Sequence, residues 1–411
     1  MKRLKFGLWG VALAAFVAVV ATACRGKQKT EEKAVEAPPP PPPEPVFDRY
    51  WNDFARLLAG LEPLPGSVLD SLEKLPETQR HRNVLQAEWS VKKQHLAKLE
   101  AFAEREFGDV RRLDRTVFYP FSGPDFITIN TLFPNANKYV MFGLEQEGTP
   151  PDVFKLSRAR YDYNLRNIQT ALDDIMRLNF FMTLDMSVEL HRAELSGVAP
   201  ILMLLMALRE NEVLDVKRFH LNADKQIVHL SDSSKIIQNP KDTSITGIEI
   251  KFRKQKGRPI QTLQYLSFNA EDPGISRSKN LTEYLLSLAP TTTYVKSASY
   301  LMHNAGFSIA REIVLENSDF LMQDDTGVPW RMLDKNLFNV RLYGNYITPI
   351  PIFRNYYQAD LVQAYQKDTA RKNVDFGLGY GNPTLTNFLT ARRTAPRPAP
   401  VPSKNDSAAK P

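Results

Sequence analysis

The chain has 411 residues, of which 43% are hydrophobic and 24% charged, a balance that excludes a disordered or fibrous protein. Cys24 is the single cysteine, so an intramolecular disulfide, a CxxC redox pair and a four-cysteine zinc site are excluded. The net charge of +7 comes from the two ends, because basic and acidic side chains balance over residues 47–391. A neutral folded part predicts no nucleic-acid partner.

Residues 1–23 resemble a lipoprotein signal peptide. Met1–Lys5 is basic, Phe6–Ala23 is mostly apolar, and Ala21-Thr-Ala23-Cys24 resembles a bacterial lipobox, although Leu is commonest where Ala21 stands. The resemblance implies that Cys24 carries diacylglyceryl and palmitate chains, which bind the protein to the membrane outside the cytoplasm. An uncleaved membrane anchor is the alternative, since about 18 apolar residues just span a bilayer.

The residue after the cysteine bears on sorting between membranes. Arg25 is not the Asp that retains many Gram-negative lipoproteins in the inner membrane. By the same resemblance, we expect the protein in the outer membrane, facing the periplasm.

Both ends of the folded part are rich in proline. Within residues 24–46, Pro38–Pro43 and Glu44-Pro45 predict a polyproline II tether of roughly 25 Å. A docking ligand for a proline-recognising domain is the alternative. Residues 392–411 are basic and contain four spaced prolines, so we expect a disordered tail there.

The elements expected between these ends follow from the apolar periodicity. We expect helices first, including a possible helical subdomain over 47–110, then two hairpins, and then a mixture of helices and short strands. The expected helices are 51–61, 79–107, 154–183, 198–208, 280–289, 294–304, 308–317 and 355–368. The expected strands are 139–144, 213–220, 226–230, 245–252, 262–268, 338–343 and 374–380. This order predicts a single α+β domain over 47–391, in which an antiparallel sheet built from hairpins packs against helices.

Several blocks resemble a family of bacterial envelope lipoproteins to which no activity is assigned. They are Phe118-Tyr-Pro-Phe-Ser-Gly-Pro-Asp-Phe126, Phe133-Pro-Asn-Ala-Asn-Lys-Tyr-Val140, Lys296-Ser-Ala-Ser-Tyr-Leu-Met-His303 and Gln323-Asp-Asp-Thr-Gly-Val-Pro-Trp330. The resemblance implies one family-wide domain. It supplies no catalytic residue.

The first block contains a tight loop. Two prolines and a glycine in Tyr119-Pro-Phe-Ser-Gly-Pro-Asp125 present Ser122 and Asp125, the first candidates for a site. The alternative is structural, with Asp125 capping a segment that starts at Phe126.

The third block offers a nucleophile and a base. On a helix, Lys296, Ser299, Tyr300 and His303 would share or neighbour one face. Ser299 could then attack a substrate with Lys296 or His303 as base. A packed, hydrogen-bonded helix face is the alternative, and the chain contains no Gly-x-Ser-x-Gly elbow.

The fourth block offers oxygen ligands. Asp324 and Asp325 could hold a divalent cation together with His303 if the fold brings them together, and no other cofactor is expected. The alternative is a capped or solvated turn. Tyr119, Tyr343 and Tyr346 are candidate ligand contacts because aromatic rings stack on sugars, although the edge of a core is the commoner explanation of such side chains.

Two functions remain open from the sequence. The first is a lipid-anchored, non-enzymatic binding or structural domain whose partner is an envelope polymer or a protein. The second is a metal-dependent or serine-type envelope hydrolase that uses the 119–125 loop, the 296–303 helix and the 323–327 turn. Convergence of Asp125, His303, Asp324 and Asp325 in one pocket would favour the hydrolase, and separate contacts would favour binding.

Overall fold

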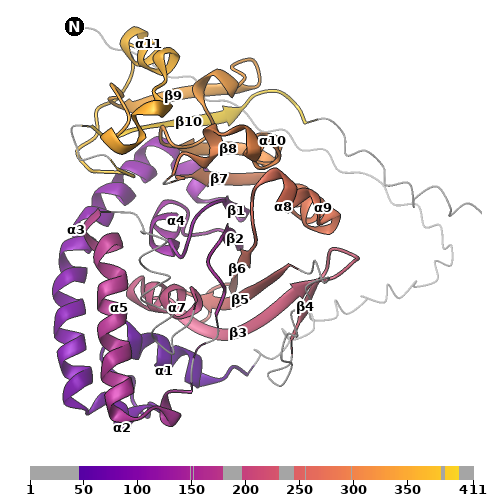
Figure 1. Ribbon diagram of the computed structural model, residues 1–411. Helices are drawn as coiled ribbons and strands as arrows, with labels where there is room; N and C mark the ends of the chain where they lie inside the picture. Colours follow the sequence, from indigo (N-terminus) through magenta and orange to yellow (C-terminus); the bar gives the residue numbers. More distant parts are fainter. Residues whose placement is uncertain are drawn as a thin grey trace, which may run out of the picture. The chain divides into compact units, whose positions relative to one another are not determined.

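The computed structural model describes residues 46–148, 150, 152–178, 197–230, 245–254, 256–297, 299–380 and 385–397 (Figure 1). The chain divides into two compact units, Met1–Val46 and Phe47–Pro411. The predicted signal peptide, Cys24, nearly all of the tether and the end of the tail lie outside the described residues.

The described residues form a ten-stranded mixed sheet in the order β4-β3-β5-β6-β2-β1-β7-β8-β10-β9 (Figure 1). The five central strands, from β6 to β8, pair in parallel, and both arms are antiparallel. The strands are β1 (Thr116–Tyr119), β2 (Lys138–Gly143), β3 (Glu212–Leu221), β4 (Ile227–His229), β5 (Thr246–Arg253), β6 (Gln261–Ser267), β7 (Thr291–Val295), β8 (Ser318–Gln323), β9 (Phe338–Gly344) and β10 (Asn387–Arg393).

Helices cover both faces of this sheet. The α-helices are α1 (Arg49–Leu58), α2 (Asp70–Glu73), α3 (Pro76–Arg111), α4 (Phe126–Leu132), α5 (Arg158–Leu178), α7 (Ala199–Leu208), α8 (Asp272–Ser276), α9 (Lys279–Leu286), α10 (Ser308–Asn317) and α11 (Ala359–Lys367). Short 3-10 turns are η1 (Val153–Lys155), η2 (Leu301–His303), η3 (Ala305–Phe307), η4 (Trp330–Met332) and η5 (Pro351–Tyr356). Among the described helices, none has the length and apolar character that a membrane span requires.

Two apolar cores lie on opposite sides of the sheet. Side chains of α1, α3, α4, α5 and α7 pack on one face with Tyr119, Tyr294 and Met322. Side chains of α8, α9, α10 and α11 pack on the other face, where Phe118 and Val295 point. Neighbouring strand residues alternate between the two cores, because side chains of a strand point to opposite faces.

The α+β prediction is confirmed, as are both hairpins. β3 pairs with β4 and β5 pairs with β6 in antiparallel registers, close to the predicted bounds. The parallel centre goes beyond the prediction. Its strands are buried on both faces, and such strands lack the alternation of a half-solvated hairpin.

Two expected elements are wrong. The helix expected over 294–304 is the end of β7 followed by a turn and η2, and Tyr300 has a positive φ of 53° that no helix allows. Three consecutive β-branched threonines begin β7, which favours a strand. The strand expected over 374–380 is bends and turns, from which Phe376 and Leu378 reach the core, and the last strand is β10.

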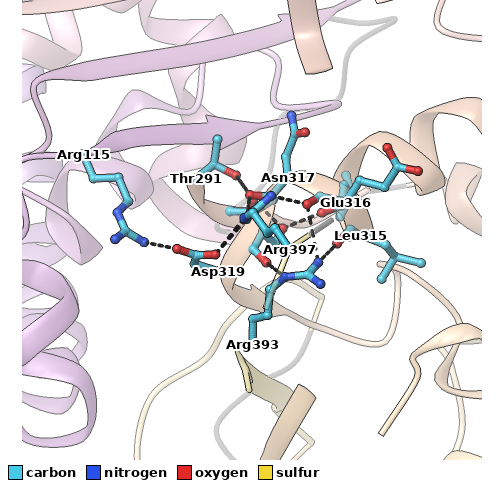
Figure 2. A network of polar contacts seen from close by, with 11 residues as sticks. Arg115, Thr291, Leu315, Glu316, Asn317, Asp319, Arg393 and Arg397 are labelled. Carbon is cyan, nitrogen blue, oxygen red and sulfur yellow. Dashed lines mark hydrogen bonds and ion pairs between the residues drawn. The ribbon is translucent and has the colours of Figure 1, made fainter. Parts of the chain in front are cut away.

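The folded unit continues past the boundary expected at residue 391. Arg393 donates to the carbonyl oxygens of Leu315 and Ser318, and Arg397 donates to those of Glu316 and Asn317 (Figure 2). These contacts satisfy carbonyls that the end of α10 leaves unpaired.

The same segment is held by a shared carboxylate. Asp319 lies 2.8 Å from Arg397 and 2.8 Å from Arg115, which precedes β1 (Figure 2). Residues 392–397 are therefore part of the fold, at the edge of the sheet where the parallel strands begin.

Candidate functional site

The parallel strands contain a topological switch point. β1 leads through α4 on one face to β2 on one side, whereas β7 leads through α10 on the other face to β8 on the opposite side. In open sheets with this property, ligands bind beyond the carboxyl ends of the strands at the point of reversal. That point lies between β1 and β7, where the 119–125 loop and Lys296 follow the two strands.

A group of buried polar side chains occupies this point, and we call it the carboxyl-edge cluster. Its members come from the ends of β1, β7 and β8, and are Tyr119, Asp125, Tyr294, Lys296, Ser297 and Asp324.

Asp125 is the centre of the cluster. Its carboxylate caps α4 by accepting from the Thr128 amide at 3.2 Å, accepts from the Tyr119 hydroxyl at 3.0 Å, and pairs with Lys296 Nζ at 2.8 Å. The capping alternative is thus confirmed. A buried ion pair persists when further hydrogen bonds satisfy its charges, as they do here for Asp125.

Asp324 lies beside this pair. It accepts from both the amide and the hydroxyl of Thr326, and burial, reinforced by the charge of Asp325, raises the pKa of its carboxyl to about 7. Gly379 has a φ of +58°, and a Cβ on it would overlap Asp324 Oδ2 and lie 3.8 Å from Lys296 Cδ. Asp324 and Lys296 are therefore neighbours beneath the backbone of Gly379.

Two hydroxyl groups in the cluster have no hydrogen-bond partner among the described residues. They are Tyr294 Oη and Ser297 Oγ, and both side chains are fully buried. The Tyr294 ring lies 4.8 Å from that of Tyr119, and burial together with the charges of Asp324 and Asp125 raises its pKa well above the ordinary value. Such buried orphan groups are rare in native proteins because each costs stability.

A second lysine reaches the cluster from α3. Burial lowers the pKa of Lys92 to about 7, with the charge of Asp125 opposing this shift and that of Lys296 adding to it. The charges of both members of the Asp125–Lys296 pair thus act on the buried Lys92 side chain.

Asp325 belongs to a separate set of contacts. Its carboxylate accepts from Tyr300 Oη at 2.6 Å and from Asn387 Nδ2 at 2.9 Å, while His303 Nε2 contacts its backbone oxygen at 3.0 Å. A cavity of about 10 Å³, lined by Asp324, Asp325 and Asn387 among others, has room for roughly one water. Burial lowers the pKa of His303 to about 4, so the ring is neutral at pH 7.

The arrangement differs from the predicted hydrolase machinery. Lys296 and Ser299 precede the short 3-10 turn η2 and do not lie on an α-helix, so they share no helical face with Tyr300 and His303. Ser299 lies exposed on a turn. Ser122 Oγ donates to the carbonyl oxygen of Gly123 at 2.8 Å. Within the described ranges, no three His, Cys, Asp or Glu side chains are grouped so that they could hold a metal ion.

The predicted aromatic contacts divide between site and core. Tyr119 belongs to the cluster. Tyr343 is buried and stacks on Phe388 at 5.1 Å, and buried Tyr346 accepts at its hydroxyl from the Gln358 amide. Tyr343 and Tyr346 therefore lie in the core, as the alternative interpretation predicted.

A comparison of the chain with protein-family models, with curated proteins and with solved structures found no match. The resemblance to envelope lipoproteins therefore stays a prediction from the motifs.

Sequence reasoning identified Asp125, Lys296 and Asp324 but missed three residues of the site. Tyr294 and Ser297 lie within residues 294–304, which were expected to be helical. Lys92 was missed because only the apolar residues of its helix were used to predict the core. The one local signal for Lys92 was its spacing, because it lies at helical intervals from the apolar residues Trp89, Leu96 and Leu99.

Proposed function

We propose that this chain is a lipid-anchored protein of the cell envelope whose folded domain binds a small polar ligand at the carboxyl-edge cluster without catalysing a reaction. The lipobox resemblance of Cys24 and the proline tether support the anchor. The anchor would hold the domain at the outer membrane, on the periplasmic side, where an envelope component or a protein can reach it.

The two orphan hydroxyls carry the binding proposal. Leaving a buried hydroxyl unpaired costs about 1–3 kcal/mol. Both unpaired hydroxyls belong to residues that border Asp324, because its charge acts on Tyr294 and the Ser297 amide donates to Thr326 Oγ1, which itself donates to Asp324. A ligand would supply the missing partners. Its location at the switch point, beside an ion pair and a carboxyl with a pKa near neutrality, fits the common position of ligand sites in such sheets.

The ligand has a chemistry that these groups define. Tyr294 and Ser297 each donate and accept, Lys296 donates, and Asp324 changes between donor and acceptor near pH 7. A compact molecule with both donors and acceptors matches this set, and because the adjoining cavity of about 10 Å³ has room for roughly one water, a ligand larger than water requires the site to open.

The test is to purify the protein from its own envelope and record a native mass spectrum. We expect a non-covalent small-molecule adduct that a Tyr294→Phe/Ser297→Ala variant loses. The matched control is Tyr139→Phe, which removes a buried hydroxyl that does have partners and should keep the adduct. Absence of an adduct from the native protein, or equal adducts in all three proteins, would overturn the proposal.

A second candidate is an acid–base hydrolase, which the pKa of about 7 at Asp324 favours. A general acid or base works best when its pKa lies near the operating pH. Incubating the recovered ligand with the native protein and with Asp324→Asn separates the two functions. Conversion by the native protein alone would identify an enzyme, and an unchanged ligand would identify a binding protein.

A further inference from the structure

A large hollow lies at the opposite edge of the sheet, where the parallel strands begin. Two cavities of about 920 and 700 Å³ share six lining residues, which are Trp89, Lys93, Leu208, Glu210, Asn211 and Lys254. The larger cavity also contacts Asp114 before β1, Asn137 before β2 and Gln261 at the start of β6. The two cavities are therefore adjacent, and we call them together the amino-edge groove.

The size of the groove indicates an extended ligand. Pockets for small molecules enclose roughly 300–1,000 Å³. Each cavity lies within that range, and the two adjacent cavities taken together exceed it. A ligand that fills both must run past Trp89 and Lys93 from one cavity to the other. A chain molecule fits this shape.

The charge of the groove is positive although residues 47–391 are neutral overall. Lysines and arginines outnumber acidic residues among the described lining residues, with Arg112, Lys254, Lys256 and Arg258 at the rim. Glu210, one of the few acids, lies between two ammonium groups, at 3.8 Å from Lys93 and 3.3 Å from Lys254. This excess of positive charge favours the binding of a polyanion.

The lining also indicates which kind of polyanion. Asn137 is exposed and adds an amide group, which both donates and accepts and so matches the hydroxyls of sugars. The amide nitrogens of Asn211 and Gln261 instead donate to backbone carbonyl oxygens and shape the wall. Trp89 is the single aromatic residue among the described lining residues and is 7% exposed, so bases of a nucleic acid would find no ring to stack on.

We propose that the amino-edge groove binds an extended polysaccharide that carries carboxylate groups. The groove is separate from the carboxyl-edge cluster, and this inference does not depend on the small ligand proposed there. Because the attraction is largely between exposed charges, binding weakens as salt is added.

The test uses the purified full chain and hexagalacturonate as the probe, with binding measured by calorimetry. Its methyl ester, which has the same length and no charge, is the matched probe. We expect saturable binding of the acid and at least about tenfold weaker binding of the ester. The thymidine hexanucleotide and hexaglutamate are further probes, and both should bind more weakly than the acidic sugar.

The groove is tested with Lys254→Gln/Arg258→Gln, compared with Arg277→Gln/Lys279→Gln, which removes equal charge from exposed positions at α8 and α9. We expect about tenfold weaker binding for the first pair and unchanged binding for the second, with equal urea midpoints for all three proteins. The proposal is overturned by absence of binding up to about 1 mM, by equal binding of acid and ester, by tighter binding of the nucleotide or peptide, or by equal loss in both variants. If the groove variant alone fails to fold, Arg112→Gln takes its place under the same criteria.

Discussion

Replacing Tyr294 by Phe should make the ligand-free protein more stable. The substitution removes the fully buried hydroxyl that has no partner among the described residues and keeps the ring that packs on Tyr119. Most substitutions of buried residues destabilise a protein, so a gain here is a specific expectation of the binding proposal.

The size of the gain follows from the cost of an orphan group. An unpaired buried hydroxyl costs about 1–3 kcal/mol, and losing one oxygen atom leaves a void too small for water. After the lost contacts of that atom are subtracted, we expect the free energy of unfolding to rise by about 1 kcal/mol.

Urea unfolding at pH 7 measures this change, provided that the slope with denaturant stays constant. Tyr139→Phe is the matched control, because Tyr139 Oη donates to the Phe133 carbonyl at 2.6 Å and accepts from Asn130 at 3.2 Å. The control should lose about 1–3 kcal/mol. If Tyr294→Phe loses as much as the control, the Tyr294 hydroxyl has a protein partner in solution and the reasoning is refuted.

Three further predictions concern the cluster and the anchor. Burial raises the pKa of Asp324 from 3.8 to about 7, so the folded state retains a proton that the unfolded state has lost. The free energy of unfolding therefore falls as the pH rises from 4 to 7, by up to about 4 kcal/mol. Asp324→Asn mimics the protonated form and should flatten this part of the urea-derived pH profile; a slope like that of the native protein contradicts it. Gly379→Ala should lower the unfolding free energy by about 2 kcal/mol or more, because of the positive φ and the overlap with Asp324, whereas a neutral effect in the same assay would show that the segment shifts freely. Cys24→Ala should move the protein from the membrane to the soluble periplasmic fraction, and Arg25→Asp should move it to the inner membrane; equal solubility of Cys24→Ala and the native protein rules out lipidation.

Local patterns in the sequence predicted those parts of the fold that local interactions determine. The antiparallel arm that contains β3, β5 and β6 follows from alternation along these strands, and the Asp125 cap follows from a carboxylate placed just before Phe126. The amphipathic pattern of apolar residues in α3 likewise predicted a helix.

The cluster could be predicted only in part, because its contacts are remote in sequence. The Asp125–Lys296 pair joins residues 171 positions apart, and Lys92 reaches it from a third element. The pairing depends on β1 and β7 being neighbours in the sheet, which no local pattern states. The local pattern predicted a helix over 294–304. For that reason the hydroxyls of Tyr294 and Ser297 were not predicted to belong to the candidate site.

The most direct measurement is a high-resolution crystal structure of the protein purified from its own envelope. We expect density for a non-protein molecule within hydrogen-bond distance of both Tyr294 Oη and Ser297 Oγ. Density for protein groups or a lone water at these two hydroxyls, with nothing larger at the carboxyl-edge cluster, would contradict the proposed binding function.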